Sequence, residues 1–183
     1  MEEIIPCYVN EAKLPVDLVF WFHQDLDCNP SVIETVEQML LKIPRARDCF
    51  SKVYFLSANI PADLDYYGDG TIIMFYKLLR NQFIQESYSY IFFMEADVWP
   101  IQSNWLSALW HHTQGVESFW MKGGIIRTKD FLSRGWGPDY HINGNSLYKT
   151  NNTCFLNFLR RVQTEYPHKP YDMAIRCIFP SPL

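Results

Sequence analysis

The stretch Tyr90-Ile91-Phe92-Phe93-Met94-Glu95-Ala96-Asp97 places two carboxylates directly behind a run of apolar residues. An unbroken apolar run of this length is typical of a strand that is covered on both faces. We therefore predict a strand over residues 89–94, with Glu95 and Asp97 at its carboxyl end, where open α/β sheets bind ligands. There the two acids could hold a divalent ion against a diphosphate, or they could simply be solvated at the start of a loop.

Two strand–helix pairs precede this stretch. Residues 17–22 and 52–57 are apolar runs of strand length. Apolar residues at helical spacing predict one helix that starts at a capping box, Ser31 to Glu34, and stops at Pro44, and another over residues 71–83. The order strand, helix, strand, helix, strand predicts an α/β fold with a mostly parallel central sheet and helices on both faces.

The second part of the chain alternates in the same way. We predict helices over residues 103–112, 153–165 and 171–178, a loop over 127–140 and a strand over 141–148. The 183 residues form one domain by length, and 48% hydrophobic residues with 20% charged residues exclude a disordered chain.

Charge and hydropathy narrow the partners and the location. The net charge is −4 and there is no Lys/Arg-rich run, so we expect no nucleic-acid partner. The apolar runs are much shorter than a membrane span needs, and the acidic start Met1-Glu2-Glu3 does not match a signal peptide. We expect a soluble, cytoplasmic protein.

The cysteines point the same way. Five of them, at positions 7, 28, 49, 154 and 177, are an odd number, are widely spaced and form no CxxC motif. This pattern predicts neither a disulfide framework nor a zinc site, and it favours reducing surroundings. Asn151-Asn152-Thr153 matches a glycosylation sequon, but without a secretory signal we expect it to cap the helix that follows.

Two blocks of the sequence resemble a known family. Residues 90–100 followed by Asn104-Trp105-Leu106 resemble the DxD segment of GT-A fold glycosyltransferases, which follows their first two β/α units. His141-Ile142-Asn143-Gly144-Asn145-Ser146-Leu147-Tyr148 resembles the second block of a subgroup that includes small glycosyltransferase domains of large algal (chlorella-type) viruses. The resemblance extends from Val16 to Arg176. It implies a single GT-A domain with a nucleotide-binding half, 1–100, and an acceptor and metal half, 101–183.

The resemblance also implies an activity and a metal. The chain would transfer a sugar from a nucleotide diphosphate donor, a UDP-sugar, to a glycan or other hydroxyl acceptor. Asp97 would ligate Mn²⁺ or Mg²⁺, while Glu95 stands in place of the first Asp of the motif, is one methylene longer, and would contact the ribose or, through water, the ion. His141 matches a late histidine ligand, and its structural alternative is an ordinary strand histidine.

Other polar residues are candidates for contacts with the nucleotide sugar. Lys77 and Arg80 would neutralise the diphosphate, or would only form a solvated helix face. The amides around Gly144 suit sugar hydroxyls, although Asn-Gly is also a common tight turn. The full set of expected contacts is Phe22, His23, Gln24, Ser57, Lys77, Arg80, Glu95, Ala96, Asn143 and Asn145.

A reaction that inverts the anomeric centre needs a carboxylate base, whereas a retaining reaction does not. Asp172 and Asp139 are the candidates, and we favour Asp172 because it begins a predicted helix near the second block. Its structural alternative is an acid that is stabilised by the helix dipole. Trp120, Trp136 and Tyr140 are candidates for stacking on a sugar.

Other enzyme classes fit less well. A haloacid-dehalogenase-type phosphotransferase needs an aspartate nucleophile where this chain has Glu95. A sugar-1-phosphate nucleotidyltransferase needs a glycine-rich basic loop after the first strand, and residues 23–27 do not form one. The alternative from another class is a catalytically inactive transferase-like domain that binds a carbohydrate or a protein.

Overall fold

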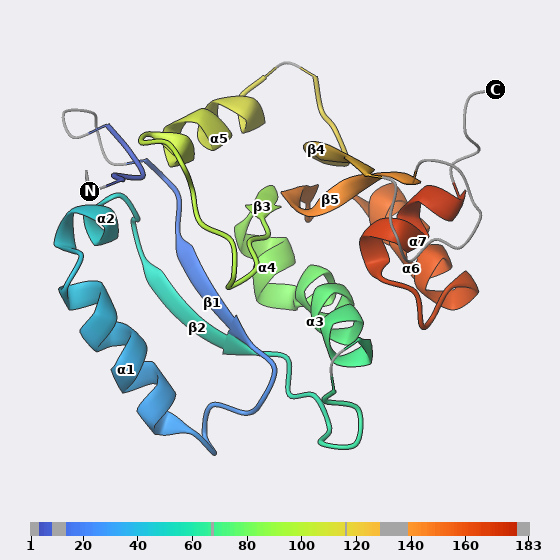
Figure 1. The fold of residues 1–183 in the computed structure, drawn as a ribbon, viewed down its shortest axis with the longest axis horizontal. Helices are drawn as coiled ribbons and strands as arrows, with labels where there is room; N and C mark the ends of the chain where they lie inside the picture. The colour runs from blue at the N-terminus through green and yellow to red at the C-terminus, as the bar shows by residue number, and fades with distance from the viewer. Residues whose placement is uncertain (1–3, 9–13, 67, 116, 129–138, 179–183) are drawn as a thin grey trace. The chain divides into compact units, whose positions relative to one another are not determined.

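The computed structural model describes residues 4–8, 14–66, 68–115, 117–128 and 139–178 (Figure 1). The chain divides into two compact units, and it crosses between them three times. Unit 1 comprises Met1–Asp65 and Val98–Glu117, and unit 2 comprises Tyr66–Asp97 and Ser118–Leu183. The described residues form a mixed α/β structure, as expected. The division into functional halves at residue 100 stays a prediction, because these units are defined by packing alone.

Unit 1 contains the first two predicted strands. β1 (Leu18–Phe22) and β2 (Val53–Ser57) pair in parallel, with Leu18 opposite Val53 and Phe22 opposite Ser57. The crossover between them contains α1 (Pro30–Leu41) and α2 (Pro44–Asp48), and α1 runs alongside the two strands (Figure 1). A parallel pair requires such a long crossover, so this part of the prediction is confirmed.

The start of α1 differs from the prediction. The helix begins at Pro30 and its N-cap is Asn29, so Ser31 is already inside the first turn and the expected capping box is wrong. Proline suits the first helical position, because the N–H that it lacks would have no partner there. The helix ends at Leu41, and Pro44 begins α2 instead of only ending α1.

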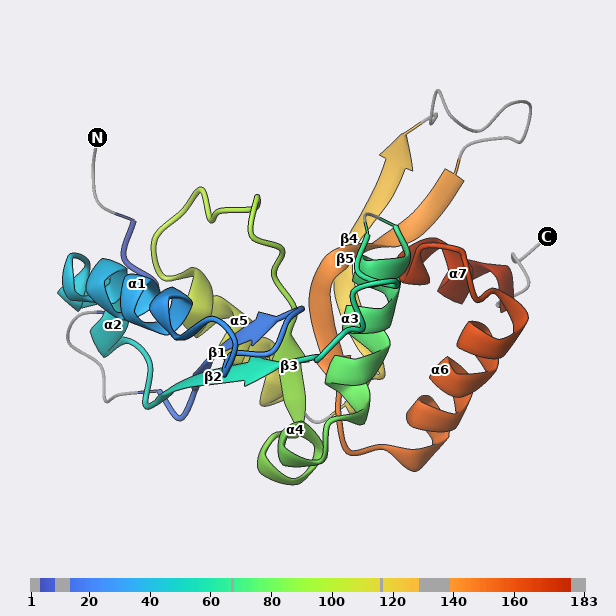
Figure 2. The same ribbon diagram turned by 90° about the horizontal axis from the view of Figure 1, so that it is seen from below.

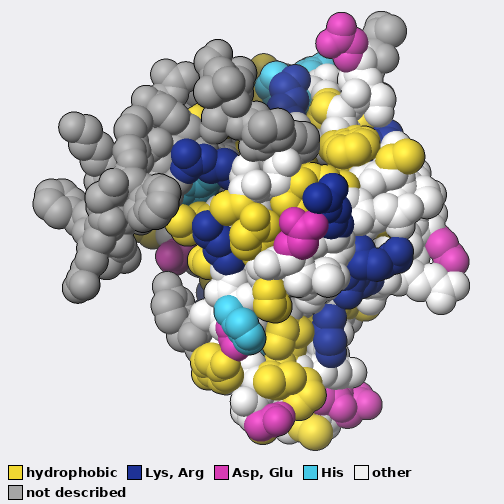
Figure 3. Space-filling view, turned by 90° about the vertical axis from the view of Figure 1, so that its right-hand side faces the viewer, with side chains coloured by type: hydrophobic (Ala, Val, Ile, Leu, Met, Phe, Trp, Pro, Cys, Tyr) yellow, Lys and Arg dark blue, Asp and Glu magenta, His cyan; other side chains and the backbone are white. Residues whose placement is uncertain are grey.

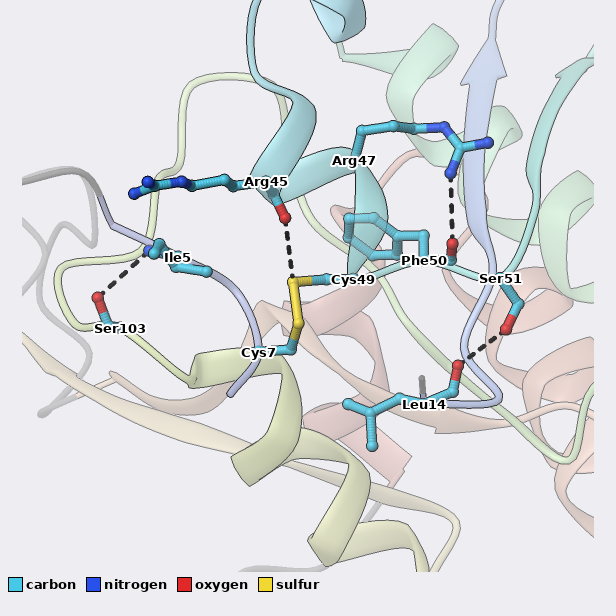
Figure 4. The surroundings of a disulfide bond; sticks show 9 residues. All are labelled: Ile5, Cys7, Leu14, Arg45, Arg47, Cys49, Phe50, Ser51 and Ser103. Atoms are coloured by element: carbon cyan, nitrogen blue, oxygen red, sulfur yellow. Dashed lines mark hydrogen bonds between the residues drawn. A yellow bond between two sulfur atoms is a disulfide. The ribbon is translucent and has the colours of Figure 1, made fainter. Parts of the chain in front are cut away.

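The core of unit 1 holds a disulfide between Cys7 and Cys49, which are 42 residues apart (Figure 4). Cys49 and Phe50 are buried together with Leu106 of α5 (Trp105–Thr113). The backbone N–H groups of Asn104 and Leu106 donate to the carbonyls of the N-terminal segment, at Ile5 and Pro6. The disulfide contradicts our expectation of a chain without disulfides. The sequence did not indicate it, because Cys7 and Cys49 are distant in sequence and only the fold brings them together.

Unit 2 contains a three-stranded antiparallel sheet. Its strands are β3 (Tyr90–Phe92), β5 (Asp139–Lys149) and β4 (Met121–Thr128), with β5 in the middle. Figure 2 shows β4 and β5 side by side along their length. The strand over 141–148 is confirmed, β4 was not predicted, and the loop expected over 127–140 falls largely on residues outside the described ones.

The single, mostly parallel central sheet that we expected is not what the described residues form. They form two small sheets, and only the pair β1 and β2 is parallel. β3 follows a helix, as a parallel strand would, but its hydrogen-bonding partner is β5, which runs in the opposite direction. The order of elements therefore predicted the existence of β3 correctly, but it predicted the wrong neighbouring strand and the wrong direction of pairing for β3.

Helices of unit 2 enclose a core against this sheet. They are α3 (Asp69–Arg80), α4 (Gln82–Ser87), α6 (Thr153–Glu165) and α7 (Tyr171–Ile178). Phe75 of α3 and Tyr148 of β5 are fully buried, and Phe75 stacks on Tyr171 with ring centroids 3.7 Å apart. α6 and α7 match the predicted ranges, and the helix expected over 71–83 is divided into α3 and α4. No helix among the described residues is both long and apolar enough to cross a membrane.

Candidate functional site

The Asn143-Gly144-Asn145 stretch forms a bulge in the middle of β5. Gly123 of β4 lies opposite Ser146 and Ile125 lies opposite Ile142, so three residues of β5 face one of β4. The alternative that Asn-Gly forms a hairpin turn is therefore wrong, because these residues lie within a strand. Bulges often occur beside functional sites, since they reorient side chains that a regular strand would alternate.

The bulge is held by its own side chains. The carboxamide oxygen of Asn143 accepts from the backbone N–H of Asn145 at 2.8 Å and from its Nδ2 at 3.0 Å. The hydroxyl of Ser146 donates to the carbonyl of Asn143 at 2.5 Å. These bonds leave the Asn145 side chain in a defined orientation toward β3.

Asn145 binds the first acid of the E-x-D motif. Its Oδ1 accepts from the backbone N–H of Glu95 at 2.7 Å, and its Nδ2 donates to the Glu95 carboxylate at 3.1 Å. Backbone pairing between β3 and β5 extends one residue beyond the end of β3, since the N–H of Phe93 donates to the carbonyl of Ser146 at 3.0 Å. Ala96 and Asp97 follow in an exposed turn. The two sequence blocks that carry the family resemblance are thus in direct contact.

A second polar pair lies in the same unit. Nε2 of His141 and Oδ2 of Asp172 are 3.6 Å apart, and only 11% and 20% of these side chains are exposed. Oδ1 of Asp172 accepts from the backbone N–H of Met173 at 2.8 Å, in the first turn of α7. Nδ1 of His141 is buried and has no hydrogen-bond partner in the described part of the chain. The structure thus places His141 against the candidate base.

Two buried tyrosines connect these groups. The Tyr148 hydroxyl donates to the carbonyl of Gly144 at 2.9 Å, and the Tyr171 ring packs on the same glycine. Burial raises the pKa of both tyrosines, and the charges of Glu95 and Asp172 raise the pKa of each of them further. Asn145, which binds Glu95, follows Gly144 in β5, and Asp172 follows Tyr171, which packs on that glycine, so Glu95 and Asp172 belong to one neighbourhood of unit 2. We call Glu95, His141, Asn143, Asn145 and Asp172 the unit 2 cluster.

The predicted metal ligands are not gathered into a ready-made ligand set. Among the described residues, no three His, Cys, Asp or Glu side chains lie close enough to hold an ion together. The donor chemistry still suits Mg²⁺ or Mn²⁺, because such ions are commonly held by one or two carboxylates together with substrate phosphates. Asp97 and Glu95 offer that set, and Asp97 is exposed at the open end of β3. The metal stays a prediction.

The expected nucleotide contacts in unit 1 form a separate group at the carboxyl ends of β1 and β2. Nδ1 of His23 lies 2.7 Å from the carboxylate of Asp65, to which Nε2 of Gln24 donates at 3.3 Å. The hydrogen bond from His23 holds the pKa of Asp65 below its ordinary value, and the bond from Gln24 contributes less. Ser57 donates to Asn59 at 2.6 Å. Phe22 ends β1 and is half-buried.

The two cations proposed for the diphosphate lie on the last turn of α3. Nη2 of Arg80 donates to Oε1 of Gln163 at 2.5 Å, and its guanidinium lies over the Tyr76 ring. Burial and the charge of Arg160 lower the pKa of Arg80. Figure 3 views the protein from the side of α6 and α7 and shows several Lys and Arg side chains spread over that face. The Arg80 guanidinium is thus engaged by side chains of its own unit, so a role at a diphosphate would require it to leave them. Lys77 is exposed on the same turn.

The remaining candidates are distributed as follows. Trp120 packs against Phe155 and Phe158 of α6, with ring centroids 5.7 and 5.8 Å away, so packing accounts for one face of it. The backbone of Asp139 pairs with Thr128 at the start of β5, but its side chain and that of Tyr140 are not described. Trp136 lies outside the described residues.

No protein-family model matches this chain, and no match was found among curated proteins or solved structures. The function of the chain must therefore be inferred from the geometry of its own candidate residues.

Three residues that contact the candidate site residues were not foreseen from the sequence. Asp65 lies eight residues after the end of β2, and no local pattern distinguishes it from the neighbouring acid Asp63. Tyr148 and Tyr171 resembled ordinary core aromatic residues, and only the tertiary structure places them against Gly144.

Proposed function

We propose that this chain is a glycosyltransferase of the GT-A type, which transfers a sugar from a nucleotide diphosphate donor, a UDP-sugar, to a hydroxyl acceptor. The observation that carries the proposal is the pair of hydrogen bonds between Glu95 and Asn145. They join an acidic motif at a strand end to a bulged amide stretch that lies beside a second carboxylate, Asp172. Acids for a diphosphate-bound cation, amides for sugar hydroxyls and a base for an acceptor are the groups that such a transfer requires.

Asp172 is the proposed base. In an inverting transfer, the acceptor oxygen forms a bond to the anomeric carbon while the bond from that carbon to the diphosphate oxygen breaks. The acceptor proton passes to Oδ2 of Asp172, and the nucleoside diphosphate leaves with the electron pair. His141, 3.6 Å from Oδ2, is the positioning residue for this carboxylate. A positioned base of this kind contributes roughly 10²- to 10⁴-fold to a rate.

Asp97 would ligate the divalent ion, and Glu95 would contact it through water. When bound, Mn²⁺ or Mg²⁺ supplies positive charge that stabilises the departing diphosphate. The chain itself fixes the position of Glu95 through Asn145, while Asp97 stays open to a ligand. In this proposal Asp97 binds the ligand and Glu95 is held by the chain. That difference fits the presence of Glu in place of the first Asp of the motif, because the longer Glu95 side chain already accepts a hydrogen bond from the Asn145 amide.

One observation favours a second function. The Glu95 carboxylate accepts a hydrogen bond from Asn145, so a ligand must compete for it or share it. A transferase-like domain that has lost activity and only binds a carbohydrate could retain the same bulge and the same amides. Metal-dependent nucleotide binding separates the two functions, since a pure carbohydrate-binding domain needs neither the nucleotide nor the ion.

Calorimetric titration with UDP and with GDP, each with and without Mn²⁺, tests the proposal. We expect binding that requires Mn²⁺ and is lost in Asp97→Ala. Asp63→Ala, which removes an exposed acid from unit 1, is the control and should bind like the wild type. If neither nucleotide binds under any condition, the proposal is wrong.

The role of Asp172 has its own test. Asp172→Asn keeps the shape of the side chain and its bond to the Met173 N–H, so donor binding should be unchanged. Transfer or donor hydrolysis in a screen of nucleotide sugars should fall by at least ~100-fold if Asp172 is the base. Equal turnover in this variant would remove Asp172 from the mechanism and would favour a retaining reaction.

A further inference from the structure

We infer that Asn151 is an N-glycosylation site. Asn151-Asn152-Thr153 is an Asn-x-Thr sequon. Asn151 is exposed in the short connection between β5 and α6, and Thr153 is the exposed first residue of α6. The chain has one other stretch of this form, Asn29-Pro30-Ser31, but proline in the middle position prevents its use. This inference goes beyond the proposed activity and does not depend on it.

Our expectation that this stretch caps the next helix is confirmed, but the cap uses only the middle residue of the sequon. The N-cap of α6 is Asn152, whose side-chain oxygen accepts from the backbone N–H of Phe155 at 2.9 Å. The acceptor position of the sequon is the preceding residue, Asn151, which lies outside the helix. Its amide nitrogen can therefore carry a substituent while α6 keeps its cap.

The disulfide is a second and independent observation, because it concerns the compartment. Cys7 and Cys49 form a bond in the core of unit 1. Structural disulfides form and persist in oxidising compartments such as the endoplasmic reticulum, which is also where Asn-x-Thr sequons are modified. We expected reducing surroundings because the cysteine pattern predicted no disulfide. The Cys7–Cys49 bond removes this reason for expecting them.

The site also leaves the proposed chemistry accessible. Asn151 lies beyond the end of β5 at Lys149, and the four strand residues from Asn145 to Lys149, at about 3.3 Å each, already span roughly 13 Å. Modification joins Nδ2 of Asn151 to the anomeric carbon of a lipid-pyrophosphate-linked oligosaccharide. The bond from that carbon to the pyrophosphate oxygen breaks, the lipid pyrophosphate leaves with the electron pair, and the amide loses one proton.

The test is to express the full chain in eukaryotic cells behind an added secretion signal and to measure its mass before and after treatment with peptide N-glycosidase. We expect one glycan on the wild type, removed by the enzyme, and none on Asn151→Gln. Thr153→Ala destroys the sequon without touching the acceptor and should also be unmodified.

Two variants separate the sequon from the cap. Asn152→Asp keeps both the sequon and an oxygen that can cap α6, and Thr153→Ser keeps the sequon hydroxyl, so both should carry the glycan. An unmodified wild-type chain would overturn the inference. A glycan that persists in Asn151→Gln would overturn it as well, because it would then be attached elsewhere.

Discussion

Gly144 shows how one residue sets the geometry of the unit 2 cluster. A Cβ at this position would contact the Tyr171 hydroxyl far inside van der Waals distance and would lie 3.1 Å from Cζ of the same ring. Tyr171 in turn stacks on the buried Phe75, so its ring has little freedom to withdraw. Glycine is therefore needed here for close approach, since only the missing side chain lets α7 pack against the bulge.

We predict that Gly144→Ala lowers the free energy of unfolding by about 1–3 kcal/mol, the usual cost of overpacking a core. Tyr171→Phe removes the atom that the new methyl group meets, so the double variant should recover part of this loss. Gly124→Ala, on the facing strand, is the matched control, because a Cβ there meets nothing within 4 Å. Urea unfolding of the four variants measures the effect, and equal stability of Gly144→Ala and Gly124→Ala would contradict it.

The pair His23 and Asp65 gives a pH prediction in unit 1. The pKa of Asp65 lies below its ordinary value of 3.8, mainly because of the hydrogen bond from His23. A lowered carboxyl pKa stabilises the folded chain above the unfolded pKa, and this contribution is lost as the pH falls through the folded value. We predict that His23→Ala raises the pKa of Asp65.

An NMR titration of the carboxyl carbon from pH 6 to pH 2 measures that pKa. Gln24→Ala is the control, and its effect should be smaller, because the bond from Gln24 is the weaker of the two influences. An unchanged Asp65 pKa in His23→Ala would show that the pair does not form in solution.

At the scale of single elements, the sequence placed the helices well and their ends less well. α6 and α7 match the predicted ranges, because their apolar periodicity and the caps are local features. α1 starts two residues earlier than the capping box indicated, because its N-cap is Asn29 instead of Ser31, and Asn29 followed by Pro30 competes as a start signal. The bulge in β5 was not foreseen, since it depends on how β4 pairs with that strand.

The cap of α6 yields a prediction at this scale. Asn152→Ala removes the acceptor for the Phe155 N–H and should lower the free energy of unfolding by about 1 kcal/mol. Asn152→Asp keeps an acceptor and should retain the stability. Chemical denaturation followed by circular dichroism measures both variants in bacterially produced protein, where the sequon plays no part, and a neutral Asn152→Ala would contradict the assigned cap.

At the scale of the whole molecule, the disulfide is the feature with the largest expected effect. It closes a loop with 42 residues of separation, and the entropy that it removes from the unfolded chain corresponds to about 4 kcal/mol. We predict that a reducing agent lowers the melting temperature of the wild type. Cys7→Ser/Cys49→Ser should melt at the lower temperature with or without reductant.

Intact-mass analysis after alkylation of the unfolded chain is the accompanying measurement. Cys7 and Cys49 should be protected without reductant, whereas Cys28, Cys154 and Cys177 are free thiols and should react. Five reactive cysteines in freshly purified oxidised protein would contradict the bond.

The sequence by itself determined the α/β class, the strand that leads into Glu95 and Asp97, and the helices that follow the second block. These features depend on periodicity and caps, which act over a few neighbouring residues. The tertiary structure alone decided that β3 pairs with β5 and that Asn145 binds Glu95. It also decided that His141 faces Asp172 and that Cys7 bonds to Cys49. Each of these contacts joins residues more than 30 positions apart, and which of many compatible partners is chosen depends on how the whole chain packs.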